Sequence, residues 1–486
     1  MEEFVNSVEN QSFPLHPVDT QSAFLNIPNQ FFFPNRTGSK DFMPSDVLKA
    51  GFYKALSHFP ILVGHLQPDK AGTTHVVVDR NNLNMPEYLE SRSTAVSFET
   101  MRKRNFHWSA WPDGVATVGG IATANSAGVI KLLNVHVVRL DDGIILFINI
   151  PHYVVDGVGY FAFAALWGEM CRTGGTAARQ YCFDRSVIAQ NLPEERTPLN
   201  KETISIFKGF NPVADWLAWL SPETRGWVLS KAQFTAGVSS STFRVARAKL
   251  DELRAQVNKY MAADEALDDA CVLATLVAMM AAHAHRDCAM EQPQRGIVAG
   301  AFGWVTGLVK SLVGSEPTHR PVVMLSDLRK GLHLERYNYT GNVLLPFNEP
   351  CPIAVLEAPI SPETLAQTAR IVTRTYTATD PPLIGSFVDM VAQNPYCFTR
   401  PMMFLQSNPK AVVVTNELDF DIYSVDFGYG QPEWACAVPS FVANFVAIMP
   451  SPPPGIDIVV NIIMKTTVLD KIVANKYWQN IATLIY

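Results

Sequence analysis

One short motif carries the residue types best suited to acid-base chemistry, HYVVDG at residues 152–157. An unperturbed imidazole titrates at about pH 6.5, so a neutral His152 can accept a proton from a hydroxyl group at cellular pH. We interpret His152 as a candidate general base. Two β-branched valines and Gly157 favour a tight loop, which Asp156 is expected to hold. The alternative is structural: a histidine satisfied at a strand end and an aspartate that caps a helix.

A second motif, DFGYG at residues 426–430, combines an aspartate with two glycines and follows the polar stretch TNELDFDIYSV. Taken alone, this pattern is typical of a glycine-rich turn at the end of a strand. The two motifs together are more informative than either one.

The elements around His152 are predicted from periodicity and turn residues. Residues 131–140 and 144–150 are rich in strand-forming side chains, and Asp-Asp-Gly at 141–143 between them is a strong hairpin signal. The second strand leads directly to the candidate base. Residues 157–171 are apolar on nearly every side, which predicts a helix buried between layers.

The other predicted elements repeat the same mixture of helices and strands. One helix is expected to start at Ser45 or Asp46 as N-cap and to end before Pro60, and another to begin near Asp268 or Asp269. In the second half, strands are expected at 322–325, 412–415 and 456–463, with a closing helix from about Val468.

Length and composition limit the class of protein. At 486 residues, of which 48% are hydrophobic and 17% charged, the chain suits two packed cores of roughly 200 residues each. We place the first domain at 1–190, a crossover segment at 191–240 and the second domain at 241–486. The formal net charge of -6 gives no basic field that would attract a nucleic acid.

Cysteine usage and the first residues indicate the compartment. Seven scattered cysteines form no CxxC pair and no cluster with metal-ligand spacing, so we expect reduced thiols and no metal site. Residues 1–13 are polar and acidic, without the basic start and apolar run of a secretory signal. We therefore expect a cytoplasmic protein.

In the order and spacing of its two motifs, the chain resembles the BAHD family of acyl-CoA-dependent acyltransferases, whose signatures are HxxxD and DFGWG. Further signatures of the family occur in order at Pro17-Val18-Asp19, Leu48 to Leu66, Asp327-Leu328-Arg329, Tyr339-Thr340-Gly341-Asn342 and Thr415. The resemblance covers nearly the whole chain and is nearer to the fungal trichothecene-acetyltransferase-like branch. The chain departs from the family where Tyr429 replaces a Trp, and where Asn416-Glu417 stands in place of Ser-Trp. Together, these departures lead us to expect a more polar acyl or acceptor pocket.

The resemblance implies a two-domain α/β fold of the chloramphenicol-acetyltransferase type, each domain a mixed sheet flanked by helices, with His152 in a channel between the domains. Acyl-coenzyme A would be the co-substrate, with no permanently bound cofactor. His152 would deprotonate a hydroxyl or amine of a small acceptor, which attacks the thioester directly without an acyl-enzyme. Thr415 would stabilise the oxyanion. The resemblance further implies that Asp156 pairs with Arg329 and that Asp426, Gly428 and Gly430 are structural. A monomer is expected.

Coenzyme A carries phosphates that need local positive charge. Four basic residues near an apparent insertion at 296–314 are candidates, with solvated surface charge as the alternative: Arg286, Arg295, Lys310 and Arg320. The insertion itself is apolar with small-xxx-small spacing, and we expect a soluble loop or lid, with an interfacial membrane contact as the alternative.

Three rival functions remain open from the sequence. A carrier-dependent condensation enzyme shares the expected fold but has HHxxxDG, and here Pro151 takes the place of the first histidine. A non-catalytic binding protein on the same scaffold is opposed by the presence of His152 and Thr415. A membrane-bound enzyme with a lipid acceptor would use residues 296–314 as its contact.

Overall fold

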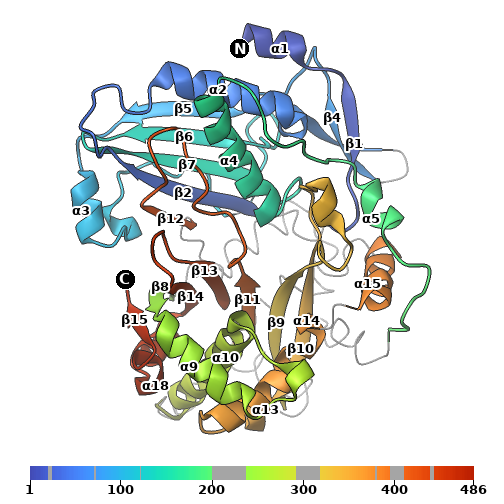
Figure 1. Cartoon of the computed structure of the whole chain (residues 1–486), viewed down its shortest axis with the longest axis vertical. Helices are drawn as coiled ribbons and strands as arrows, with labels where there is room; N and C mark the ends of the chain where they lie inside the picture. The colour runs from blue at the N-terminus through green and yellow to red at the C-terminus, as the bar shows by residue number, and fades with distance from the viewer. Residues whose placement is uncertain are drawn as a thin grey trace, which may run out of the picture.

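The computed structural model of the chain describes residues 1–19, 25–69, 73–120, 122–199, 237–291, 318–377, 380–393, 410–437 and 443–486. Within these residues, three sheets with flanking helices form a mixed α/β fold. Figure 1 shows the two larger sheets in opposite halves of the molecule, one built mainly from the N-terminal part of the chain and the other from its C-terminal part. The predicted α/β class is confirmed.

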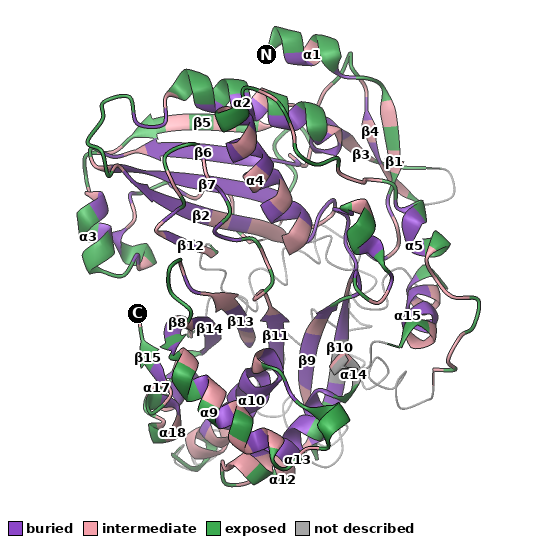
Figure 2. Ribbon diagram, in the orientation of Figure 1, coloured by how far each residue is buried: buried purple, intermediate pink, exposed green. Residues whose placement is uncertain are grey.

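The first sheet has the strand order β12-β2-β7-β6-β5. Its strands are β2 (Asn26–Pro34), β5 (Glu87–Arg92), β6 (Asn134–Arg139), β7 (Gly143–Pro151) and β12 (Trp434–Ala437). β6 and β7 form an antiparallel hairpin, which confirms the two strands predicted at 131–140 and 144–150. Every residue of β7 is buried, so this strand is covered on both faces, as Figure 2 shows. The burial explains why β7 is nearly continuously apolar instead of alternating.

Two helices, α2 (Ser45–His58) and α4 (Gly157–Thr173), pack against each other on this sheet (Figure 1). Their approach is close because Gly51 has no side chain: a Cβ there would lie 2.3 Å from Sγ of Cys171. α4 confirms the buried helix predicted at 157–171. It begins directly after the loop that holds the candidate base.

The N-cap of α2 differs from the prediction. The cap position is occupied by Pro44, and Ser45 is the first helical residue. The hydroxyl of Ser45 is bonded to the carboxylate of Glu90 and therefore does not cap the helix. The predicted cap at Ser45 or Asp46 was thus wrong by one or two residues.

The second sheet has the strand order β10-β9-β11-β13-β14-β8-β15. Its strands are β8 (Val238–Val245), β9 (His319–Asp327), β10 (Leu344–Pro352), β11 (Val412–Asn416), β13 (Phe445–Pro450), β14 (Ile458–Lys465) and β15 (Ala482–Leu484). β11 is parallel to both of its neighbours, β9 and β13. The strands predicted in the second half are confirmed, and the structure extends the first of them at both ends.

Helices cover the second sheet. The longest helix, α10 (Asp269–Glu291), is buried along most of its length, and its start confirms the prediction near Asp269. The other helices are α1 (Glu2–Ser7), α3 (Phe98–Lys103), α5 (Ser186–Gln190), α9 (Arg247–Asn258), α12 (Ile353–Leu356), α13 (Pro362–Val372), α14 (Arg374–Thr377), α15 (Pro381–Gln393), α17 (Thr466–Val473) and α18 (Lys476–Gln479). β1 (Gln11–Pro14), β4 (Thr74–Val78) and β3 (His65–Pro68) form the third sheet.

One segment crosses the predicted division at 1–190, 191–240 and 241–486. β12 lies late in the chain, yet it pairs with β2 of the first sheet. Apolar side chains that precede it, among them Tyr423 and Phe427, belong to the core under α4. Residues 422–437 therefore complete the N-terminal half by covering the edge of β2. In addition, β8 begins inside the predicted crossover segment, of which residues 200–236 lie outside the described part of the chain.

None of the helices in the described residues is both long and apolar enough to cross a membrane. The apolar insertion at 296–314 lies outside these residues. The six cysteines in the described part of the chain are unpaired.

Candidate active site

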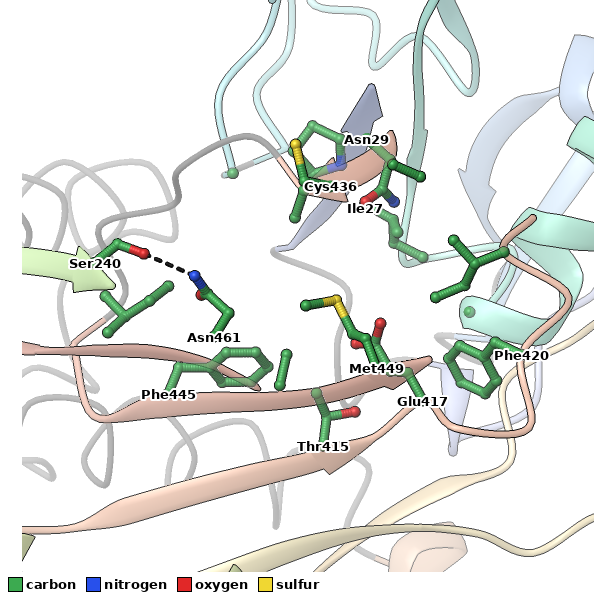
Figure 3. Close-up of a pocket in the computed structure, with 18 of the residues that line it drawn as sticks. Ile27, Asn29, Ser240, Thr415, Glu417, Phe420, Cys436, Phe445, Met449 and Asn461 are labelled. Atoms are coloured by element: carbon green, nitrogen blue, oxygen red, sulfur yellow. Dashed lines mark hydrogen bonds between the residues drawn. The ribbon is translucent and has the colours of Figure 1, made fainter. Parts of the chain in front are cut away.

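His152 lies in the turn between β7 and α4, where its backbone N–H donates to the carbonyl of Leu25 (2.9 Å). It lines a pocket of about 250 Å³ to which both large sheets contribute. The first sheet supplies Ile27 and Asn29 from β2, and the second supplies Thr415 from β11. Figure 3 shows these side chains on different walls of the same pocket.

The tautomer of His152 is set by Asn342. Nδ2 of Asn342 donates to the carboxylate of Asp19 (3.0 Å) and to the carbonyl of His152 (2.9 Å). Both partners only accept, so the amide orientation is fixed and its Oδ1 must accept from Nδ1 of His152, at 2.7 Å. The proton of a neutral ring therefore sits on Nδ1. Nε2 is left with the lone pair that a general base needs.

A buried ion pair supports Asn342. Asp19 accepts from the backbone N–H of Asn342 (3.0 Å) and from Nε of Arg185 (3.3 Å). Arg185 also donates to the carbonyl of Val154 within the HYVVDG loop (2.7 Å). Both charged side chains are almost completely buried, so each depends on the other for compensation. The pair connects the start of the chain to the loop that carries the candidate base.

Asp156 is engaged by Arg329, so the structure brings together the pair that the resemblance implied. The guanidinium of Arg329 holds both carboxylate oxygens of Asp156 at 2.8 Å in a bidentate pair. Arg329 also donates to Asp327 (2.9 Å) and to the carbonyl of Gly341 (2.8 Å). Asp156 in turn accepts from the backbone N–H of Gly159 and caps α4. These contacts lock the loop to the strand end of β9.

Burial is the main influence on the pKa of His152. The surrounding protein lowers this pKa below its usual value, while the charge of Asp156 and the hydrogen bond to Asn342 oppose the shift. A lowered pKa keeps the imidazole neutral at cellular pH. The ring is therefore prepared to accept a proton.

Strand alternation places Thr415 and Glu417 on the pocket side of β11 and its extension. Residues two apart on a strand point to the same face, and both side chains line the pocket, as Figure 3 shows. Asn416 between them points away and donates to the hydroxyl of Tyr376 (3.2 Å). Burial raises the pKa of Glu417 to about 7. The pocket therefore contains a carboxyl group where the family usually has a tryptophan.

The close approach of Phe420, from the C-terminal half of the chain, leaves no room for a side chain at Gly157. A Cβ at this position would lie 2.2 Å from the ring of Phe420. Phe420 itself lines the pocket. The absence of a side chain at Gly157 thus lets the segment that follows β11 close over the start of α4.

The DFGYG motif lies outside the pocket and forms a turn on α4. Asp426 accepts from the backbone N–H groups of Gly428 (2.8 Å) and Gly430 (3.0 Å). These glycines have φ of +95° and +93°, a region that side chains disfavour. The carbonyl of Asp426 packs so closely on Gly168 that a Cβ there would lie 2.4 Å away. The hydroxyl of Tyr429 donates to the carbonyl of Asp41 (3.2 Å) and makes no part of the pocket wall.

Two of the basic residues expected to meet phosphates, Arg286 and Arg320, do not line this pocket. Arg320 is buried at the start of β9 and donates to Glu357 (2.7 Å), and Arg286 lies beside Asp287 (3.2 Å). Arg320 is separated by about 16 Å of strand from Leu325, the β9 residue in the pocket wall. Arg295 and Lys310 lie outside the described residues.

Sequence reasoning assigned no role to Asn342, Asp19 or Arg185. Asn342 and Asp19 stand in quoted motifs, which was a usable signal. Arg185 lies in none of them, so only the structure identifies it.

The fold of the chain is similar to that of several solved structures. The structure of TRI101 from F. graminearum with coenzyme A and deoxynivalenol has a TM-score of 0.72 at 14% identity, with 98% of this chain and 100% of that chain covered. Vinorine synthase gives 0.57 at 17% identity, covering 95% and 92%. The peptide synthetase FmoA3 gives 0.51 at 12% identity, with 94% of this chain but 40% of that chain covered. At these identities the likeness shows a shared fold. No curated protein sequence matches the chain.

The match to a protein family is more specific. The Transferase family matches residues 5–478, which is nearly the complete sequence. The two motifs and the fold agree with this match, and the TM-score is higher for TRI101 than for vinorine synthase. The chain belongs to the Transferase family, the BAHD acyltransferases, and is an acyltransferase.

Proposed function

We propose that the protein transfers an acyl group from coenzyme A to a hydroxyl group, or an amine, of a small specialised metabolite, with His152 as the general base. The observation that carries this proposal is the hydrogen bond from Nδ1 of His152 to Asn342, which leaves the lone pair on Nε2. The TRI101 structure, which holds coenzyme A together with deoxynivalenol, supports the two substrate classes.

The chemistry follows from a neutral imidazole in a pocket between two sheets. Nε2 of His152 removes the proton of the acceptor hydroxyl, and the oxygen attacks the thioester carbonyl in the same complex. Collapse of the tetrahedral intermediate breaks the carbon–sulfur bond. The imidazolium then returns its proton to the departing thiolate, so that one residue serves both steps and no acyl-enzyme forms.

Thr415 is our candidate for stabilising the oxyanion. Its hydroxyl lines the same pocket as His152, and β11 fixes its backbone between two parallel strands. A donor aimed at the developing oxyanion typically lowers the barrier by about 3 kcal/mol. Asp156 and Arg329 contribute by holding the loop and not by touching the substrates.

The test is thiol release from a panel of acyl-CoAs in the presence of mixed hydroxylated metabolites. We expect release that requires an acceptor and falls by about 10²- to 10⁴-fold in His152→Ala. His58→Ala, which changes an exposed histidine at the end of α2, is the matched control and should behave as the parent protein. Absence of thiol release and of coenzyme A binding by calorimetry would favour a carrier-dependent or non-catalytic role instead.

A further inference from the structure

Glu417 is the one acidic side chain among the described residues that line the pocket. No lysine or arginine lines the pocket within this part of the chain. The described residues form no hydrogen bond or ion pair with the Glu417 carboxylate. The backbone of Glu417 is held by two hydrogen bonds: its N–H donates to the carbonyl of Ile448 (2.8 Å), and its carbonyl accepts from the N–H of Phe420 (3.1 Å).

The surroundings of this carboxyl group are apolar. Figure 3 shows Glu417 between Met449 and Phe420, and Ile27 contributes to the opposite wall. Desolvation is the sole cause of the raised pKa of Glu417. An uncompensated acid in such a place costs stability, and a neutral side chain of similar size would pack there at lower cost. Costly ionisable groups of this kind occur preferentially at functional sites.

The wall of the pocket also contains several aromatic side chains. The aromatic residues of its wall include Trp108, Trp111, Phe161, Phe420, Trp434 and Tyr486. Aromatic rings attract cations through the negative charge of their faces, and they attract neutral polar groups far less. Within the described part of the chain, the pocket wall combines a single carboxylate with an aromatic lining and no basic side chain, and this combination matches a cationic ligand better than a neutral one.

We propose that the acceptor carries a protonated or quaternary amine, bound by Glu417 and the aromatic wall, in addition to the hydroxyl group that is acylated at His152. This inference rests on the proposed acyltransfer and names the chemical class of its acceptor. Glu417 acts here as a specificity residue, since it touches the acceptor away from the reacting oxygen. No bond is made or broken by this contact.

A proton is released when the cation binds at low pH. The charge of the ligand favours the ionised form of Glu417, so the acid gives its proton to the solvent on binding. The other titratable groups of the pocket wall are His152, Cys436 and Tyr486. Burial raises the pKa of the Cys436 thiol to about 12 and that of the Tyr486 phenol above its usual value, so both stay neutral near pH 7. The pKa of His152 is shifted in the opposite direction, below its usual value, so the titration of His152 is distinct from that of Glu417.

The experiment compares two small probes that differ only in charge: choline, and its carbon analogue in which a tert-butyl group replaces the trimethylammonium group. Binding to the full-length protein is followed at pH 8 by quenching of tryptophan fluorescence and by calorimetry. We expect choline to bind at least about tenfold more tightly than the neutral analogue. In Glu417→Gln this preference should shrink clearly, because only the aromatic wall is then left to favour the cation.

Asp419→Asn is the matched control. It removes the same charge from an exposed position two residues further along the same segment, and it should keep the preference for choline. Equal binding of the two probes by the parent protein would overturn the proposal, as would a preference for choline that is undiminished in Glu417→Gln. Near-UV circular dichroism establishes that the variant is folded.

A thiol-release assay with acetyl-CoA separates this inference from the proposed function. Release with a neutral hydroxyl acceptor but no preference for choline would leave the acyltransferase standing and reject the cation site. Preference for choline without any thiol release that depends on His152 would reject the acyltransferase while the cation site stands.

Discussion

Oδ1 of Asn342 accepts a 2.7 Å hydrogen bond from Nδ1 of His152, although the two residues are 190 positions apart in the sequence. The bond fixes both the orientation and the tautomer of the ring. Asn342 is itself held by Asp19 and by the carbonyl of His152. The base is therefore positioned by the start of the chain, the HYVVDG loop and the segment before β10 together.

Replacement of Asn342 by Ala should lower kcat by about a hundredfold, because the ring loses its fixed tautomer. The hydrogen bond to Asn342 raises the pKa of His152, so its loss should lower that pKa further. The acid limb of the pH profile of kcat/KM would then move to lower pH, although the variant enzyme is slower. A variant that is merely less stable would leave the position of this limb unchanged. Steady-state rates between pH 5 and 8 make the measurement.

The oxyanion role of Thr415 is tested by Thr415→Val, which keeps the shape of the side chain and removes its hydroxyl. We expect kcat to fall by about 10²-fold with little change in KM for acyl-CoA, since the hydroxyl would act on the transition state. Thr415→Ser retains the donor and should keep most of the activity. Loss of binding instead of turnover in Thr415→Val would contradict the assignment.

Arg329→Met should destabilise the fold by about 3–5 kcal/mol, because it leaves the buried Asp156 carboxylate without its partner. The double variant with Asp156→Asn should recover part of this loss. Arg92→Met breaks an exposed pair with Asp141 and should cost at most about 1 kcal/mol. Urea unfolding of the three variants gives the comparison. Equal costs for the buried and the exposed pair would refute the argument.

Glu417→Gln should change how stability depends on pH. The folded pKa of Glu417 is raised from 4.5 to about 7, so the folded state binds more protons than the unfolded state in this range. The parent protein therefore loses stability from this group as the pH rises from about 4.5 to 7, by up to about 3 kcal/mol. The variant lacks this loss. Its thermal midpoint should exceed that of the parent at pH 8 and approach it at pH 5.

Local features were predictable because they depend on neighbouring residues. The β6–β7 hairpin follows from two β-rich runs around Asp-Asp-Gly, and α4 follows from an apolar stretch of helical length. The loop between this hairpin and α4 was predicted from the two β-branched valines before Gly157. The motif order was sufficient to indicate the family.

The sequence by itself thus determined the class of fold, the family and the identity of the candidate base. Only the tertiary structure decided what surrounds that base: Asn342 on Nδ1, the Asp19–Arg185 pair behind it, and, in the pocket wall, a Glu417 carboxyl group that no described residue pairs with. It also moved β12 into the first sheet and kept Arg320 away from the pocket. Hydrophobic periods and turn residues act over a few positions, whereas these contacts join segments far apart in the chain. Such contacts form only when both sheets have packed, because their partners are selected by burial and charge in three dimensions.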